Sequence, residues 1–332
     1  MESAMLFLDN LNNHDPRINL AFEEYAIRHI APDEEILLFY INEPSIIIGR
    51  NQNTVQEINV DYVNEHALHV VRRLSGGGAV YHDLGNLNFS FIAPFSADNF
   101  HNFKKFTEPV LKVLQAMGAN AELSGRNDLT IEGKKISGNA QYVSGQRMVS
   151  HGTLLYQTDL DRVGDALRVK AAKIESKGIK SVRSRVANIS EYLQNPPDIL
   201  NFRQKIIDQV FAKQPFTACT FSEADWAGVR QLVQERYDTW AWNFGRSPAF
   251  NLRRETRYPG GEIEALLTVT RGIIKEIRFF GDFFGQREIA ELEDALRGTK
   301  YQPEQMRRAL GNLKITDYFV NFSLDELVSL LY

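Results

Sequence analysis

The chain has 332 residues, which exceeds the usual size of one domain and suits two. Hydrophobic residues make up 43% and charged residues 24%, as in an ordinary globular protein with a sizeable core. The net charge of −4 argues against a general basic surface for nucleic acid, so local groups must hold any nucleotide. The single cysteine rules out an internal disulfide, and no run is long and apolar enough to span a membrane. We therefore expect a cytoplasmic protein without nucleic-acid or membrane partners.

The N-terminal part predicts one helix followed by strands. The helix begins after Asp15, whose carboxylate can cap free amides, and Pro16, which suits the first helical position. Two apolar runs, Ile36–Ile41 and Ser45–Gly49, predict strands. The stretch His69–Ala93 predicts a strand, a glycine turn and a second strand.

The middle of the chain mixes helices and strands. Phe103–Met117 predicts an amphipathic helix that ends at Gly118. The elements expected after it are a hairpin over Asp128–Ile131 and Lys134–Ala140, a strand over Gly152–Tyr156, a mobile basic loop leading to a helix start over Arg168–Arg185, and a helix over Asn201–Lys213.

A change of composition near Trp240–Arg254 predicts a domain boundary. Beyond it, the patterns predict strands over Ile263–Val269 and Ile273–Phe279 and helices over Arg287–Leu296, Pro303–Leu310 and Leu324–Leu331. We expect a main domain over residues 1–246, a linker over residues 247–254 and a small α+β domain over residues 255–332.

The strongest motif is Arg72–Asn86, in which Arg73 precedes Ser75-Gly76-Gly77-Gly78 and then His82. Consecutive glycines let a backbone approach a ligand closely and adopt positive φ, and their amides can bind an anion. Arg73 can neutralise a carboxylate or a phosphate. The alternative is a flexible hairpin turn beside an exposed arginine pair, but the flanking Arg, His and Asn residues favour a ligand site.

The second motif is the predicted hairpin that contains Asp128 and Lys135. If Ile136 faces the core, strand alternation places Lys135 and Ser137 on the opposite face, with the Lys135 ammonium in a cleft. A fixed cation there can bind a phosphate and stabilise charge at an attacked carbonyl. Asp128 can hold magnesium or orient the lysine. The alternative is a surface hairpin with a solvated lysine pair.

Two further features are weaker. His151 opens a strand, where a histidine is often only a hydrogen-bonded structural residue. The run Ser176–Val186 carries Lys180 and Arg183 among other cations. Such a cluster is usually a solvated face, although beside a nucleotide site it can close over phosphates.

Together these segments resemble lipoate–protein ligase A. The matching runs, in the family's order, are Arg72–Asn86, Ser124–Leu129, Lys135–Ala140, His151–Leu155, Lys177–Val186 and Trp242–Phe250. The resemblance implies an α+β fold, with a mixed β-sheet catalytic domain similar to biotin ligases and class II synthetase cores and a small α+β C-terminal domain. It also implies that lipoate and ATP give lipoyl-AMP and pyrophosphate, and that the lipoyl group then passes to a lysine of a lipoyl domain.

The resemblance also implies roles for individual residues, with Lys135 as the catalytic lysine. The implied lipoate-binding residues are Arg73, Ser75, Gly76, Gly77, Gly78, Val80, His82, Asn86 and His151. The implied ATP- and adenylate-binding residues are Gly78, Tyr81, Asn127, Asp128, Lys135, Ser137, Gly138, Lys180 and Arg183.

Cofactors and partners follow from the same resemblance. It implies Mg²⁺ with ATP, held near Asp128, and no tightly bound prosthetic group. The implied acceptors are lipoyl domains of 2-oxoacid dehydrogenase E2 subunits or the glycine-cleavage H protein, and we expect a monomer. The sequence does not decide which acceptor is preferred.

Alternative functions remain at this point. An ATP-independent octanoyl or lipoyl transferase often forms a thioester on a cysteine, but the only cysteine here, Cys219, lies far in sequence from the glycine run. Such transferases also typically lack a C-terminal domain. A biotin ligase is disfavoured because the loop lacks that family's repeated Gly-Arg pattern. A non-catalytic protein that binds lipoate or a lipoyl domain is the remaining alternative, although Lys135 and the glycine run are intact.

Overall fold

The computed structural model describes residues 5–50, 52, 54–96, 98–100, 102–125, 127–167, 185–211, 216–245, 250–259, 261–281, 283 and 287–332. The chain forms two compact units. Unit 1 comprises Met1–Arg50 with Gln56–Thr239, and unit 2 comprises Asn51–Val55 with Trp240–Tyr332. None of the helices in these described stretches has the length and apolar character needed to cross a membrane.

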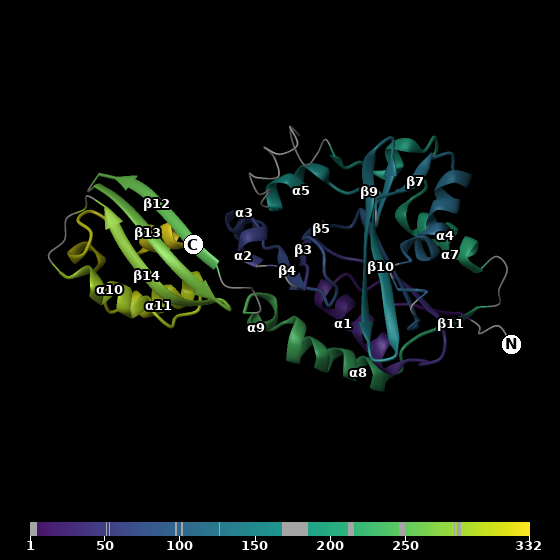
Figure 1. Ribbon diagram of the computed structural model, residues 1–332, viewed down its shortest axis with the longest axis horizontal. Helices are drawn as coiled ribbons and strands as arrows, with labels where there is room; N and C mark the ends of the chain where they lie inside the picture. Colours follow the sequence, from purple (N-terminus) through teal and green to yellow (C-terminus); the bar gives the residue numbers. More distant parts are fainter. Residues whose placement is uncertain are drawn as a thin grey trace. The chain divides into compact units, whose positions relative to one another are not determined.

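Unit 1 is built on a mixed sheet of eight strands (Figure 1). In spatial order they are β11 (Thr217–Cys219), β1 (Leu6–Leu8), β2 (Ile36–Ile41), β6 (Asn86–Pro94), β10 (Arg147–Leu155), β9 (Lys134–Ser144), β8 (Asp128–Ile131) and β7 (Ala121–Ser124). Strand β1 pairs in parallel with β11 and β2, whereas the remaining neighbours are antiparallel. A second sheet has the order β4 (His69–Arg72), β3 (Ser45–Ile48) and β5 (Val80–His82). The predicted α+β fold with a mixed sheet is confirmed.

Helices pack around the two sheets of unit 1. Those of unit 1 are α1 (Pro16–His29), α3 (Val60–Glu65), α4 (Phe103–Ala116), α5 (Leu160–Ala166), the 3₁₀ turn η2 (Ile189–Tyr192), α7 (Ile199–Phe211), α8 (Glu223–Leu232) and the π-helical turn η3 (Val233–Tyr237). The short helix α2 (Thr54–Glu57) begins in unit 2 and ends in unit 1. Helices α4 and α7 lie side by side (Figure 1). Their residues Phe106 and Phe202 belong to the same apolar core as Phe89 and Phe91 of β6.

Strand β6 is buried on both faces, and one of these faces is polar. Its alternate residues Leu87 and Phe89 join the apolar core under α4 and α7. The residues that alternate with them are Asn86, Asn88 and Ser90. These are also buried, but on the opposite face of the strand. Buried polar side chains need partners, so a polar layer inside the protein marks a place for hydrogen-bonded networks or a ligand.

Local sequence signals explain the element boundaries. The Asp15 carboxylate accepts a hydrogen bond from the Arg17 amide at 2.8 Å, and Pro16 starts α1, as predicted. Glu132 (φ 50°) and Gly133 (φ 74°) both adopt left-handed backbone between β8 and β9. Positive φ at both central residues is the geometry of a two-residue hairpin turn, so the predicted hairpin is confirmed.

Unit 2 is a three-stranded antiparallel sheet with helices. Its elements are α9 (Trp240–Asn243), β12 (Phe250–Tyr258), β13 (Gly261–Thr270), β14 (Ile273–Gly281), α10 (Ile289–Leu296), α11 (Pro303–Leu310), the 3₁₀ turn η4 (Ile315–Asp317) and α12 (Leu324–Leu331). The two strands and three helices predicted beyond residue 255 are confirmed. Residues 250–254 of the expected linker instead form the start of β12, where they pair with residues 265–269 of β13. The limits of the functional domains stay a prediction.

Other expectations differ from the structure in detail. Strand β10 starts at Arg147, five residues before the expected Gly152, because it pairs along its full length with β6. Helix α8 was not predicted, although Ser222 and Asp225 form a capping box at its start. The predicted mobile loop lies outside the described residues except for Arg185.

Candidate active site

A cavity lies on the polar face of β6 and β10, beside the loop between β4 and β5. It is lined by Leu20, Tyr40, Ile47, Arg73, Gly77, Gly78, Ala79, Val80, His82, Asn88, Asn127, Lys135, Gly138, Asn139, Ala140, His151, Gly152 and Thr153. Leu20, Ile47 and Val80 give it an apolar wall, whereas Lys135 and Arg73 bring cations. The cavity therefore suits a ligand with an apolar part and an anionic part.

Arg73 organises the glycine loop from within the protein. Its Nη2 atom donates to the carbonyl oxygens of Gly76 (2.7 Å) and Gly78 (2.8 Å), and Nη1 donates to the Ile47 oxygen (3.1 Å). Gly77 between them has φ +95°, and a Cβ there would lie 2.9 Å from Arg73 Nη2. Burial lowers the pKa of Arg73 to about 10, so it remains a cation at neutral pH. Most N–H groups of the Arg73 guanidinium therefore bind the glycine loop itself, a structural role that the sequence did not predict.

Lys135 stands at the edge of the cavity, as strand alternation predicted. Ile136 is fully buried in the core, and the Lys135 ammonium lies 2.9 Å from Asp128 Oδ1. Gly138 lies directly beneath this ammonium, because a Cβ added there would sit 2.9 Å from Lys135 Nζ. The side chains of Lys135 and Asp128 are 41% and 38% exposed, so both can reach a ligand.

Ser137 does not share the position of Lys135. The pairing of β8 with β9 shifts register between Leu129 and Thr130, and this bulge disturbs the simple alternation on which the expectation rested. Ser137 is fully buried, and its Oγ accepts a hydrogen bond from Asn139 Nδ2 at 3.2 Å. It contributes to the support of the cavity wall and not to the lining.

The two site histidines have different surroundings. His151 bonds on both nitrogens: Nδ1 lies 2.9 Å from Glu23 Oε1, and Nε2 lies 2.7 Å from Ser75 Oγ. His82 bonds through Nδ1 to Asn42 Nδ2 at 3.0 Å. Burial, followed by the nearby charge of Arg73, lowers the pKa of His82 to about 3, so it is neutral at physiological pH.

Most of the predicted site residues that the structure describes meet at this cavity. Those in its lining are Arg73, Gly77, Gly78, Val80, His82, Asn127, Lys135, Gly138 and His151. Those outside the lining are Ser75, Gly76, Tyr81, Asn86, Asp128 and Ser137. Ser75 and Asp128 bond directly to lining residues, and Asn86 Nδ2 donates to Asn88 Oδ1 at 3.0 Å. Lys180 and Arg183 lie outside the described residues.

Sequence reasoning missed the residues that α1 and β2 bring to the site. Leu20 and Tyr40 line the cavity, and Glu23 and Asn42 support its histidines. One signal was present: glutamates and asparagines stand within otherwise apolar runs, where a buried polar side chain requires a partner. A second signal was the alternation of asparagine with apolar residues from Asn86.

Two other kinds of chemistry would depend on a thioester on Cys219 or on a bound metal ion. Cys219 lies in β11, at the edge of the large sheet, and is not part of the cavity lining. A thioester on this residue therefore finds no support from the site. In the described part of the chain, no group of three or more histidine, cysteine or acidic residues is arranged to hold a metal ion.

Comparisons with known proteins give matches over both units of the chain. Residues 15–211 match the Lipoyl protein ligase A/B catalytic domain, and residues 247–331 match the Bacterial lipoate protein ligase C-terminus. The chain is 51% identical over 331 residues to lipoate–protein ligase LplJ of Bacillus subtilis, covering 99% of this chain and 100% of that protein.

Two solved structures are similar in fold. One is the bipartite lipoate protein ligase of Thermoplasma acidophilum, described with its E2 lipoyl domain (TM-score 0.65, 32% identity, 74% of this chain and 97% of that chain). The other is lipoate–protein ligase A bound with ATP (TM-score 0.63, 30% identity, 74% of this chain and 100% of that chain). Because family matches span both units and the relatives are similar over nearly the whole chain, this protein belongs to the lipoate–protein ligase family.

Proposed function

We propose that the protein is an ATP-dependent ligase that condenses lipoate with ATP to lipoyl-AMP and pyrophosphate. It then transfers the lipoyl group to a lysine of a lipoyl domain. The observation that carries the proposal is one cavity that combines an apolar wall with the partly exposed side chain of Lys135, which ends in an ammonium. The apolar wall suits the carbon chain of lipoate, and the ammonium suits a phosphate or a carboxylate.

The chemistry explains why such a cavity suffices. A carboxylate is a poor acyl donor, and adenylation gives it a good leaving group. The enzyme then needs mainly to align the carboxylate with the α-phosphate and to neutralise the charge that develops. Lys135 provides that charge, and Asp128 orients it through the 2.9 Å ion pair. We assign Arg73, the glycine loop, His82, Asn86 and His151 to the lipoate side of the cavity.

Mg²⁺ is proposed to accompany ATP. Magnesium usually takes one or two protein carboxylates together with substrate phosphates. Asp128 fits this requirement, because its carboxylate is 38% exposed at the cavity edge. When bound, the ion would neutralise phosphate charge. Tyr81, Asn127, Gly138, Lys180 and Arg183 are assigned to the nucleotide side on the family pattern alone, and buried Ser137 is assigned there only as support, through its hydrogen bond with Asn139.

The acceptor is proposed to be the lipoyl domain of an E2 subunit, with the glycine-cleavage H protein as a second candidate. The relative from Thermoplasma acidophilum, described with its E2 lipoyl domain, supports the first acceptor. We further propose that the protein works as a cytoplasmic monomer, which light scattering of the purified protein and cell fractionation will test.

The decisive experiment measures pyrophosphate release from the pure protein with lipoate, ATP and Mg²⁺, and detects lipoyl-AMP by mass spectrometry. We expect release that depends on lipoate. Lys135→Ala should abolish lipoyl-AMP formation while the protein stays folded, because it removes a cavity-edge charge and no core volume. Lys134→Ala is the matched control, since its side chain is exposed on the same strand and does not line the cavity.

Two outcomes would contradict different parts of the proposal. Normal lipoyl-AMP yield from Lys135→Ala would overturn the role of the ammonium and leave the reaction in place. Lipoylation of an acceptor from an already lipoylated donor, without ATP and without pyrophosphate release, would establish a transferase instead.

A further inference from the structure

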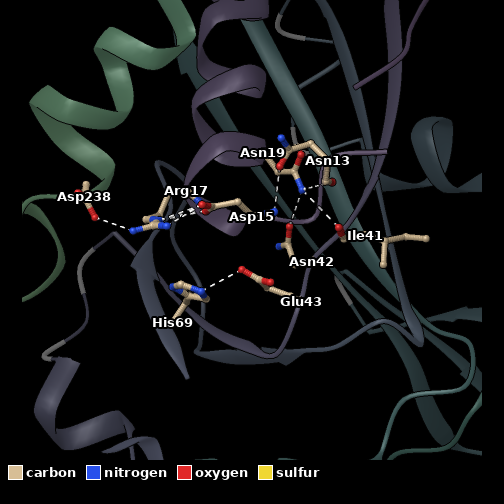
Figure 2. Close-up of polar contacts among 9 residues, drawn as sticks. All are labelled: Asn13, Asp15, Arg17, Asn19, Ile41, Asn42, Glu43, His69 and Asp238. Atoms are coloured by element: carbon tan, nitrogen blue, oxygen red, sulfur yellow. Dashed lines mark hydrogen bonds and ion pairs between the residues drawn. The ribbon is translucent and has the colours of Figure 1, made fainter. Parts of the chain in front are cut away.

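A chain of buried side-chain amides lies behind His82. Asn19 comes from α1, Asn42 follows β2, and both are fully buried. Asn19 Nδ2 lies 2.9 Å from Asn42 Oδ1 (Figure 2). Asn42 Nδ2 in turn lies 3.0 Å from His82 Nδ1. Three residues distant in sequence thus form one hydrogen-bonded line that ends at a cavity residue.

The direction of this line is fixed by backbone groups. Asn19 Nδ2 lies 2.9 Å from the Asn13 carbonyl oxygen and 3.3 Å from that of Ile41, as Figure 2 shows. Carbonyl oxygens only accept, so the nitrogen of the Asn19 amide must face them. Asn19 Oδ1 correspondingly accepts from Asn10 Nδ2 at 2.9 Å. Asn42 therefore presents its oxygen to Asn19 and its amide nitrogen to His82.

This direction determines the tautomer of His82. An amide nitrogen donates, so His82 Nδ1 accepts and the ring proton sits on Nε2. His82 Nε2 is buried, belongs to a cavity-lining residue and has no hydrogen-bond partner in the described part of the chain. The second site histidine differs, because His151 is bonded on both nitrogens.

We propose that Asn42, held by Asn19, is a positioning residue that keeps His82 as a neutral Nε2–H donor directed at an oxygen acceptor of the bound acyl substrate. A buried donor without a partner is costly, and a substrate oxygen satisfies it. The same tautomer prevents His82 Nε2 from taking a proton from the attacking lysine, so His82 is a hydrogen-bond donor and not the general base. The substrate part of this inference rests on the proposed function.

Asn42→Asp tests the inference with almost no change of shape. A carboxylate still accepts from Asn19, but it cannot donate to His82, so His82 Nδ1 must now carry a proton. Asn102→Asp is the matched control: Asn102 caps α4 by accepting from the Lys105 amide at 3.2 Å, and aspartate caps equally well.

The primary readout is the ¹⁵N NMR spectrum of protein labelled on its seven histidines, with His82 identified by its loss in His82→Gln. We expect the wild type to carry the proton on Nε2 alone, Asn42→Asp to carry a proton on Nδ1, and Asn102→Asp to match the wild type. A wild-type His82 protonated on Nδ1 overturns the inference, and this holds even if Asn42→Asp does not fold.

The second measurement is the KM for lipoate and for ATP. We expect Asn42→Asp to raise the KM for lipoate by about ten- to a hundredfold, the loss of one buried hydrogen bond, with a much smaller change for ATP. Saturating lipoate should also shift the His82 Nε2 signal in the wild type. Lipoate that binds without moving this signal overturns the assignment of the acceptor. A wild type with the expected tautomer but no pyrophosphate release would refute the proposed function and leave the tautomer intact.

Discussion

Gly138→Ala tests whether the position of the Lys135 ammonium controls the reaction. A Cβ at residue 138 would lie 2.9 Å from Lys135 Nζ and 3.0 Å from Cε, whereas ordinary contacts begin near 3.4 Å. The ammonium must therefore move by about 0.5 Å. The Gly138 backbone does not require positive φ, so alanine fits the strand itself.

The displacement of the ammonium should change the stability of the fold very little and slow the reaction considerably. The end of Lys135 is flexible and 41% exposed, so the free energy of unfolding should change by less than about 0.5 kcal/mol. A 1 Å misplacement of a reacting group costs about a hundredfold, so half that distance should lower kcat/KM for adenylation about tenfold.

The assay is lipoate-dependent pyrophosphate release, combined with urea unfolding of the same samples. Gly164→Ala is the control, because nothing lies within 4 Å of a Cβ at that helical position and it is remote from the lining. We expect it to keep full activity. Wild-type kcat/KM for Gly138→Ala would refute the reasoning, and a large loss of stability would show that the clash lies elsewhere.

Two further predictions concern stability. Glu24 is fully buried and bonds to Arg28, Arg236 and Tyr237, so Glu24→Ala should cost about 3–5 kcal/mol in urea unfolding. The exposed helix pair of Glu108 with Lys112 offers the contrast, and Glu108→Ala should cost less than about 1 kcal/mol; equal losses would contradict the role of burial. His82 stays neutral in the fold down to a pKa of about 3, whereas the unfolded chain takes up this proton below about pH 6.5. The free energy of unfolding should therefore fall by about 1.4 kcal/mol per pH unit below 6.5 through this group, and His82→Gln should remove that slope; an unchanged slope would contradict the burial of a neutral His82.

Local sequence signals sufficed for much of the fold. Asp15 and Pro16 predicted the start of α1, and Glu132-Gly133 predicted the turn of the β8–β9 hairpin. These features depend on neighbours within a few residues, so the physical causes lie in the local sequence. Apolar Ile136 likewise predicted that Lys135 would face the cavity.

The tertiary structure alone decided how the site is assembled. Glu23 and Asn42 come from α1 and the end of β2, and only the folded sheet brings them to His151 and His82. No local pattern encodes those distances, nor the direction in which a buried amide donates. The register shift that separates buried Ser137 from Lys135 has the same origin, because register is set by pairing with β8.

The sequence by itself determined which chemical groups are available and, for several of them, which element carries them: a glycine loop after Arg73, a lysine on a hairpin, and a histidine, His151, that opens a strand. The tertiary structure decided what each group does. It directs the Arg73 donors at the loop carbonyls and leaves His82 Nε2 without a hydrogen-bond partner among the residues that the structure describes. The physical reason is that hydrogen-bond roles depend on distance and direction across the fold, whereas a sequence pattern records only residue type and spacing.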